Sequence, residues 1–174
     1  KDAEEKPALI LMNHSAFIDL EIVSRIFYPR PYSIVCTSDG FVGKKPLMRG
    51  LGCIPTNKFV SDITLVKDIA YALKKKKISV LMYPEASYSF DGTETPIPQS
   101  LCRLVKRLRV PVIMIKTEGA FLRDPLYNCL QKRKVNVSAD VSCLLSEKEI
   151  EEKSLSEIDE VLRGAFTFDN FRDQ

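Results

Sequence analysis

Two spacings of apolar residues alternate along the chain and predict two kinds of element. Short, nearly continuous apolar runs are typical of buried strands, and they lie at 7–12, 32–36, 53–55, 78–83 and 110–115. Apolar residues that recur every three or four positions predict amphipathic helices, and these lie at 17–26, 61–77 and 101–108. In residues 134–141 the polarity of the side chains alternates, as in a strand with one solvent-exposed face. Strands alternating with helices predict an α/β fold, with a largely parallel central sheet flanked by helices.

Signals for helix ends add detail to this picture. Ser15 precedes the first helical stretch and is a candidate N-cap for it. Two capping-box patterns stand near the end of the sequence: Ser146 with Glu149, and Ser154 with Glu157. They predict one or two surface helices in an acidic tail over residues 145–174. No linker or repeat divides the sequence, so we expect a single domain over residues 1–174, with functional loops beyond the carboxyl ends of the strands.

Composition and charge narrow the class of protein. Apolar residues make up 45% and charged residues 28% of the chain, which is typical of a globular domain. No apolar run approaches the roughly 18 residues that cross a bilayer, and no signal peptide is recognisable. The net charge is +3, yet residues 146–174 hold nine acidic and four basic residues, so the body of the chain is basic. A basic body favours an anionic partner, although the lysines at 74–77 equally fit a solvated helix face.

Cysteine and histidine usage argues against two kinds of site. The five cysteines form no C-x-x-C pair and stand mostly in apolar contexts, so we expect reduced, mostly buried thiols. With a single histidine, a structural zinc site is not expected. No G-x-S-x-G nucleophile elbow and no phosphate-binding P-loop motif is present.

His14 is the only histidine and follows a predicted strand. A carboxylate five residues later, Asp19, can fold back across one turn and accept the imidazole N–H, which would fix the tautomer and leave the other ring nitrogen to take a proton. A capped histidine at a strand end remains the alternative. A base without its own nucleophile suits activation of a substrate hydroxyl, which then attacks an activated acyl group. Backbone N–H groups of a strand-to-helix loop would stabilise the resulting oxyanion.

Four blocks in order resemble the 1-acyl-glycerol-3-phosphate acyltransferase family, the glycerolipid acyltransferases. Residues 13–19 (NHSAFID) match N-H-x4-D, and 51–58 (LGCIPTNK) resemble a G-x-I-P segment that ends in a basic residue. Residues 83–89 (YPEASYS) resemble F-P-E-G-T-R-S, and 110–113 (VPVI) resemble the fourth block. The resemblance spans about residues 7–145.

This resemblance implies a glycerolipid acyltransferase-like fold and transfer of a fatty acyl group to a lysolipid hydroxyl. His14 would be the general base and Asp19 its orienting partner, with acyl-CoA or acyl-carrier protein as co-substrate and no metal or other cofactor. It also implies peripheral attachment to the cytoplasmic face of a membrane, through N-terminal helices that would precede Lys1. The substrate-binding residues that it implies are Asn13, Ser15, Lys58, Glu85, Ala86 and Ser87.

Departures from the family pattern concern the third block. Ala86, Ser87 and Tyr88 stand where the family usually has Gly, Thr and Arg, and tyrosine cannot replace the bidentate cation. Another acceptor, less dependent on phosphate, therefore stays open. The alternative function is a catalytically degenerate domain that binds lipid or acyl carrier. Nucleic-acid binding is not expected, because no aromatic residues are interleaved with the basic clusters.

Overall fold

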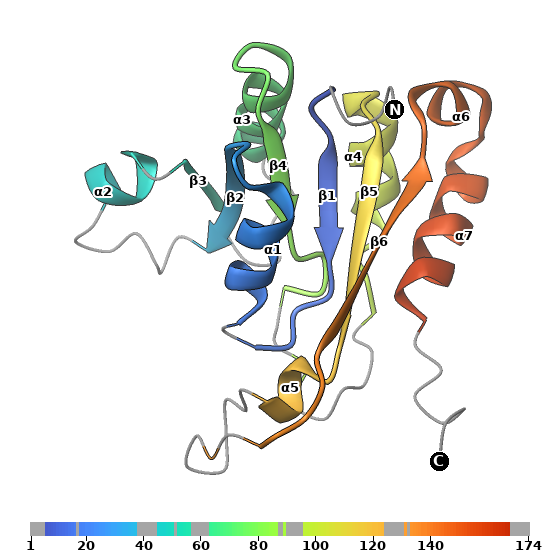
Figure 1. Cartoon of the computed structure of the whole chain (residues 1–174). Coiled ribbons are helices and arrows are strands. Elements are labelled where there is room, and N and C mark those ends of the chain that lie inside the picture. The colour runs from blue at the N-terminus through green and yellow to red at the C-terminus, as the bar shows by residue number, and fades with distance from the viewer. Residues whose placement is uncertain are drawn as a thin grey trace.

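The computed structural model describes residues 6–16, 18–37, 45–50, 52–56, 63–86, 89, 96–123, 131 and 133–167. A six-stranded sheet has the order β3-β2-β4-β1-β5-β6 (Figure 1). The strands are β1 (Leu9–Met12), β2 (Tyr32–Thr37), β3 (Cys53–Thr56), β4 (Ser79–Met82), β5 (Val112–Glu118) and β6 (Ser138–Leu145). Every neighbouring pair is parallel except β5 and β6. The predicted α/β fold with a largely parallel sheet is confirmed.

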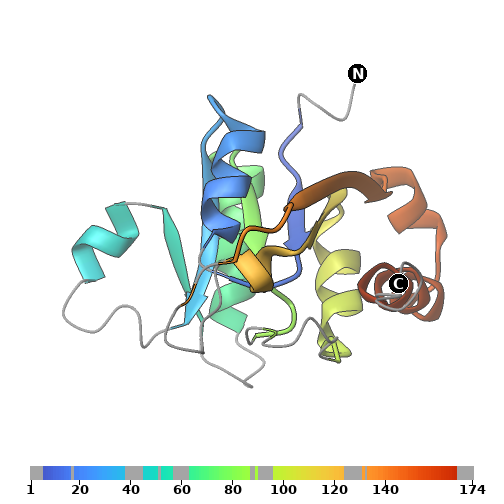
Figure 2. The same cartoon turned by 60° about the horizontal axis from the view of Figure 1, so that its bottom comes forward.

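Helices cover both faces of this sheet (Figure 2). They are α1 (Asp19–Phe27), α2 (Lys45–Gly50), α3 (Ile63–Lys74), α4 (Ser100–Leu108), α5 (Ala120–Arg123), α6 (Glu147–Glu152) and α7 (Leu155–Phe166). In the central strand β1, Leu9 and Leu11 pack with α3, α4 and α7, whereas Ile10 and Met12 pack with α1. Successive side chains of a strand point to opposite faces, and here both faces are buried. Because neither face of β1 meets solvent, the sequence at 7–12 is an unbroken apolar run.

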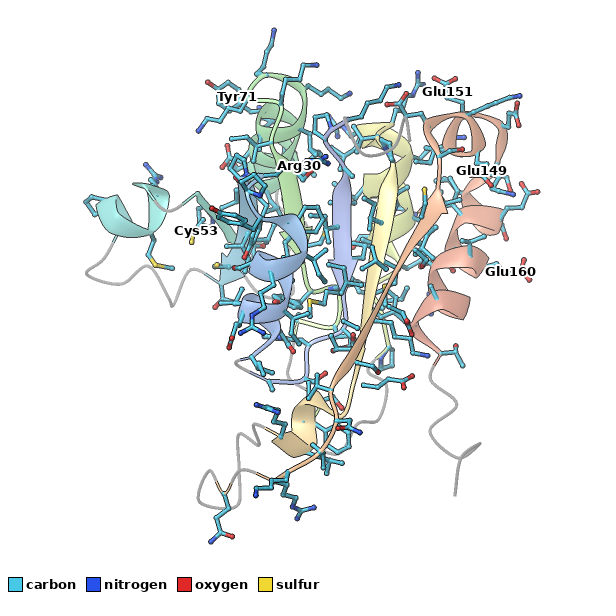
Figure 3. All side chains as sticks on the ribbon, viewed as in Figure 1. Arg30, Cys53, Tyr71, Glu149, Glu151 and Glu160 are labelled. Atoms are coloured by element: carbon cyan, nitrogen blue, oxygen red, sulfur yellow. The ribbon has the colours of Figure 1, made fainter. Side chains whose placement is uncertain are left out.

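The carboxyl-terminal helices contribute to the core as well as to the surface. Both capping boxes are formed: in each, the serine hydroxyl accepts from the backbone of the glutamate, which bonds back to the serine N–H. Figure 3 shows Glu149, Glu151 and Glu160 on α6 and α7, the acidic part of the chain. However, Ile158, Leu162 and Phe166 of α7 are buried in the core. The expectation of one or two surface helices therefore missed the side of α7 that is buried in the core.

Two expectations about boundaries and burial were wrong. The last strand, expected at 134–141, is β6 at 138–145, because its hydrogen-bonded partner β5 ends at Glu118 opposite Ser138. Of the four described cysteines only Cys102 is buried, whereas Cys36 and Cys53 are half-buried and Cys143 is exposed. Cys53 and Cys143 lie on β3 and β6, the two edge strands, and Cys36 lies near the end of β2, beyond the residues of that strand that pair with β4.

The lysines at 74–77 lie far from the carboxyl edge of the sheet. Lys74 ends α3, and the chain enters β4 at Ser79, so these exposed lysines lie at the amino ends of the parallel strands. Tyr71 and Arg30 lie at the same edge (Figure 3). No helix in the described ranges is long and apolar enough to span a membrane.

Candidate active site

The predicted pair of His14 and Asp19 is formed at the carboxyl end of β1. The ring nitrogen Nδ1 of His14 lies 3.0 Å from Oδ2 of Asp19. A carboxylate only accepts hydrogen bonds, so Nδ1 is the donor, and Nε2 is the nitrogen that this contact does not use. The side chain of His14 is 17% exposed and that of Asp19 is 0% exposed. The buried acid thus orients an imidazole that remains reachable from solvent.

Asp19 also organises the loop that carries His14. Its Oδ2 accepts the backbone N–H groups of Ser15 at 2.8 Å and Ala16 at 3.1 Å. The residue is the first of α1, where the positive end of the helix dipole favours a carboxylate. Its other oxygen, Oδ1, is buried and has no hydrogen-bond partner among the described residues. The carboxylate therefore makes its hydrogen bonds to the loop through one oxygen.

Ser15 does not cap α1, contrary to the sequence expectation. The residue before the helix is Ile18, which makes no side-chain capping bond. The hydroxyl of Ser15 instead accepts from Nδ2 of Asn13 at 3.2 Å. The side chain of Asp19 binds the N–H groups of Ser15 and Ala16, which precede the helix, so it holds the loop rather than the first turn of α1.

Asn13 ties the end of β1 to the end of β5. Its Oδ1 accepts the N–H of Thr117 at 2.8 Å, and its Nδ2 donates to the carbonyl of Thr117 at 2.9 Å. Both residues are buried. The amide thus extends the parallel pairing of β1 and β5 by one side chain, and it fixes the position from which the His14 loop departs.

Glu85 connects the segment 83–89 to the segment 13–19, which carries His14. Its Oε2 accepts the backbone N–H of His14 at 3.2 Å, and the N–H of Ser89 donates to the carbonyl of His14 at 2.7 Å. Glu85 is buried, and the ring of Tyr83 stacks on the His14 imidazole with centroids 3.9 Å apart. Ala86 has a positive φ of 54°, a conformation that glycine adopts without strain. A glycine at this position would therefore be less strained than the alanine.

Three backbone N–H groups of the loop after β1 are not available as the oxyanion donors that the sequence analysis expected from a strand-to-helix loop. The N–H groups of His14, Ser15 and Ala16 are all bound by carboxylates, those of Glu85 and Asp19. An N–H that donates to a buried carboxylate is not available to a developing alkoxide. These three donors therefore position His14 instead.

The structure brings together six of the eight predicted site residues, and the prediction missed two of their neighbours. His14 and Ser15 bond Asp19 directly, Asn13 bonds Ser15, and Glu85 bonds His14. Ala86 follows Glu85 in the chain. Lys58 and Ser87 lie outside the described residues. Thr117 and Tyr83 were not predicted as parts of the site. Each stands at or just after the end of a parallel strand, and that position was the available signal.

Cys36 offers no competing nucleophile. Burial raises the pKa of Cys36 to about 12, and the neighbouring Cys53 adds to the effect. A thiol with that pKa stays protonated at neutral pH, and the thiolate is the reactive form. Among the described residues, no group of three His, Cys, Asp or Glu side chains is placed to hold a metal ion.

Comparisons with known proteins place this geometry in a family. The model of the family described as Acyltransferase matches residues 1–117. Among solved structures, the chain resembles the 1-acyl-sn-glycerophosphate (LPA) acyltransferase PlsC from Thermotoga maritima, with a TM-score of 0.63 at 16% identity. The match covers 92% of this chain and 66% of that one, so the chain spans about two thirds of that protein's length and shares its fold. None of the curated protein sequences matches this chain. The match over most of its length shows that the chain belongs to the Acyltransferase family.

Proposed function

We propose that the protein transfers a fatty acyl group from acyl-CoA or acyl-carrier protein to the hydroxyl of a lysolipid, such as 1-acyl-glycerol-3-phosphate. The observation that carries the proposal is the 3.0 Å contact between His14 Nδ1 and the buried Asp19 Oδ2 at the carboxyl edge of the sheet. Ligand sites of open α/β sheets lie at this edge. Family membership supplies the acyl chemistry, and the geometry supplies a base for it.

The reaction needs one proton carrier. Nε2 of His14 takes the proton from the acceptor hydroxyl while the oxygen attacks the thioester carbonyl carbon. Asp19 stabilises the imidazolium that forms, as a buried carboxylate does for a general base. The tetrahedral intermediate then collapses, the carbon–sulfur bond breaks, and the departing thiolate receives the proton from Nε2. The products are the acylated lipid and the free thiol.

The remaining site residues have supporting roles in this proposal. Asn13, Ser15, Glu85 and Ala86 hold the loop beside the reacting hydroxyl, and Lys58 and Ser87 remain predicted contacts of the acceptor. The acceptor is a membrane lipid, so we also propose peripheral attachment to the cytoplasmic face of a membrane. The basic body of the chain supports this, because anionic lipid surfaces attract lysine and arginine.

Incubation with acyl-CoA and a panel of lysolipids tests the proposal. We expect release of free thiol together with one acylated lipid, identified by mass spectrometry. Thiol release without an acylated lipid would indicate a thioesterase and contradict the proposal. Absence of both would favour a lipid-binding domain without turnover, the function that the altered third block suggests.

A further inference from the structure

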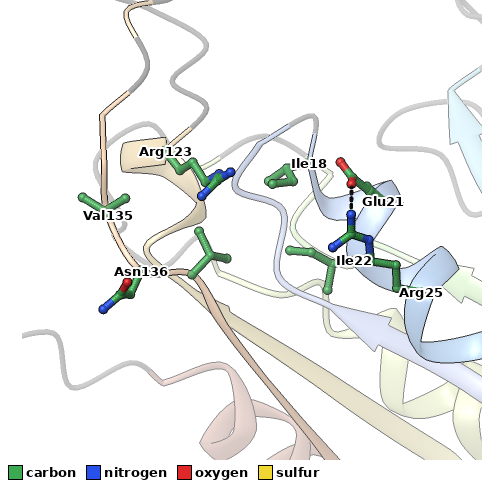
Figure 4. A pocket seen from close by; sticks show the side chains of 8 residues that line it. Ile18, Glu21, Ile22, Arg25, Arg123, Val135 and Asn136 are labelled. Carbon is green, nitrogen blue, oxygen red and sulfur yellow. Dashed lines mark hydrogen bonds and ion pairs between the residues drawn. The ribbon is translucent and has the colours of Figure 1, made fainter.

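A pocket of about 520 Å³ opens between α1, α5 and the segment that leads into β6 (Figure 4). Its size falls within the range of small-molecule sites. The apolar part of its wall comes from Ile18 and Ile22 on one side and from Val135 and Val137 on the other. Its polar part comes from side chains of both helices and from Asn136 of the segment before β6. The pocket therefore offers an apolar wall and charged groups to a single ligand.

The charges in this pocket leave one arginine without a carboxylate. Arg25 donates to Glu21 at 2.7 Å, which neutralises both side chains. Arg123 also lines the pocket and forms no ion pair with any described residue. Among the described residues of the lining, the three charged side chains thus sum to one positive charge. A guanidinium presents parallel N–H donors that match the oxygens of a phosphate.

The pocket adjoins the His14 loop through two connections. Ile18, in its wall, immediately precedes Asp19, which holds His14. On the other side, a Cβ at Gly119 would lie 2.4 Å from the carbonyl oxygen of Asn136, so the pocket segment is pressed against the end of β5. That strand end is where Thr117 bonds Asn13, directly before His14. The pocket and the proposed base therefore share one edge of the sheet.

We infer that this pocket binds the phosphomonoester headgroup of the acceptor lysolipid, with Arg123 as the phosphate contact and the isoleucine and valine wall against the adjoining methylene groups. The inference rests on the proposed acyl transfer and adds to it the residues that would bind the headgroup of the acceptor. It also accounts for Tyr88, which stands where the family usually has arginine. In this chain the cation comes from α5 instead. Coenzyme A carries phosphates too, so the test must separate acceptor from donor.

Calorimetric titration without acyl donor measures the headgroup site directly. The probes are 1-hexanoyl-glycerol-3-phosphate, its neutral counterpart 1-hexanoyl-glycerol, and coenzyme A. Both lipids are used below the concentration at which they form micelles. We expect Arg123→Gln to weaken binding of the phosphate lipid about tenfold, because a hydrogen bond to a charged group is lost at a partly solvated site. Binding of the neutral lipid and of coenzyme A should not change.

Two further variants make the test specific for this pocket. Arg107→Gln removes an exposed arginine of α4 and should leave all three affinities unchanged. Glu21→Gln removes the carboxylate from the pocket wall and should strengthen binding of the phosphate lipid about twofold, since exposed charge pairs are weak. Equal weakening of both lipids by Arg123→Gln, weakening of coenzyme A alone, or no effect would overturn the assignment.

Failure of the pocket assignment can be distinguished from failure of the proposed acyl transfer. Phosphate binding that depends on Arg123, without acylated product from any lysolipid, would refute acyl transfer and retain the pocket as an anion site. Acylation of the phosphate lipid with the same KM in wild type and Arg123→Gln would refute the pocket assignment and retain acyl transfer.

Discussion

Replacing Asp19 with asparagine separates the charge of this residue from its hydrogen-bond geometry. Oδ2 accepts N–H groups from Ser15, Ala16 and His14, so an asparagine must place its oxygen there and its NH2 group where Oδ1 lies. The reverse orientation would set the NH2 group against three donors. The variant should therefore retain the bond from His14 Nδ1 and lose only the negative charge. It should also bury an unpaired NH2 group, because Oδ1 has no partner among the described residues.

The size of the effect follows from the geometry. Charge centres about 4 Å apart interact by roughly 4 kcal/mol at an effective dielectric constant of about 20. Hydrogen bonds to charged groups contribute about 1.5–3 kcal/mol, and we take about 2 kcal/mol within that range as the smaller value. A loss of about 2–4 kcal/mol in stabilisation of the imidazolium corresponds to a kcat reduced by roughly 30- to 1,000-fold. The buried NH2 group should additionally lower the free energy of unfolding by about 1–3 kcal/mol.

Two measurements check this reasoning. Thiol release gives kcat, and nitrogen-15 chemical shifts of the imidazole report which ring nitrogen carries the proton. We expect Asp19→Asn to lower kcat in the range given and to keep the proton on Nδ1. Asp68→Asn, the same change at an exposed position of α3, should alter neither quantity. An unchanged kcat in Asp19→Asn, or a proton moved to Nε2, would refute the role assigned to the charge.

Three further predictions concern stability and reactivity. Urea denaturation should show that Ala86→Gly raises the free energy of unfolding by about 0.5 kcal/mol, because the relief of the positive φ exceeds the entropy that glycine gains in the unfolded chain. The control Ala70→Gly, within α3, should lower the free energy of unfolding by about 1 kcal/mol. Lys106→Met should lower it by about 1–2 kcal/mol, since the ammonium donates to three backbone carbonyls at the end of α6, and an increase would contradict that role. Iodoacetamide at pH 8 should label the exposed Cys143 and spare Cys36, whose pKa is about 12, so rapid labelling of Cys36 shown by peptide mapping would contradict its burial.

The local sequence pattern was sufficient to predict the core strand β1 and the contact between His14 and Asp19 that follows it. The apolar run at 7–12 predicted β1, because a strand buried on both faces has no polar side. The five-residue spacing of His14 and Asp19 predicted their contact, because both belong to one strand-to-helix connection. The two capping boxes were likewise predictable, since each joins residues three positions apart.

Contacts between distant segments were not predictable from pattern alone. Asn13 bonds Thr117 across 104 residues, and His14 bonds Glu85 across 71. Such pairs depend on the order of strands in the sheet, which a single sequence does not determine. The wrong assignment of Ser15 as a cap has the same origin, because its hydroxyl is taken by Asn13, which Thr117 holds in place. Arg123 escaped notice because its pocket is assembled from three separate segments.

The His14→Asn variant tests the central claim most directly. Its Nδ2 can take the place of the ring Nδ1 and keep the bond to Asp19, yet the variant has no counterpart of Nε2. General-base catalysis typically contributes about 10²–10⁴-fold, so we expect transfer of acyl groups to lysolipid to fall by at least about a hundredfold while the thermal unfolding curve stays close to that of the wild type. Transfer at the wild-type rate in this folded variant would contradict the claim that His14 removes the proton from the acceptor.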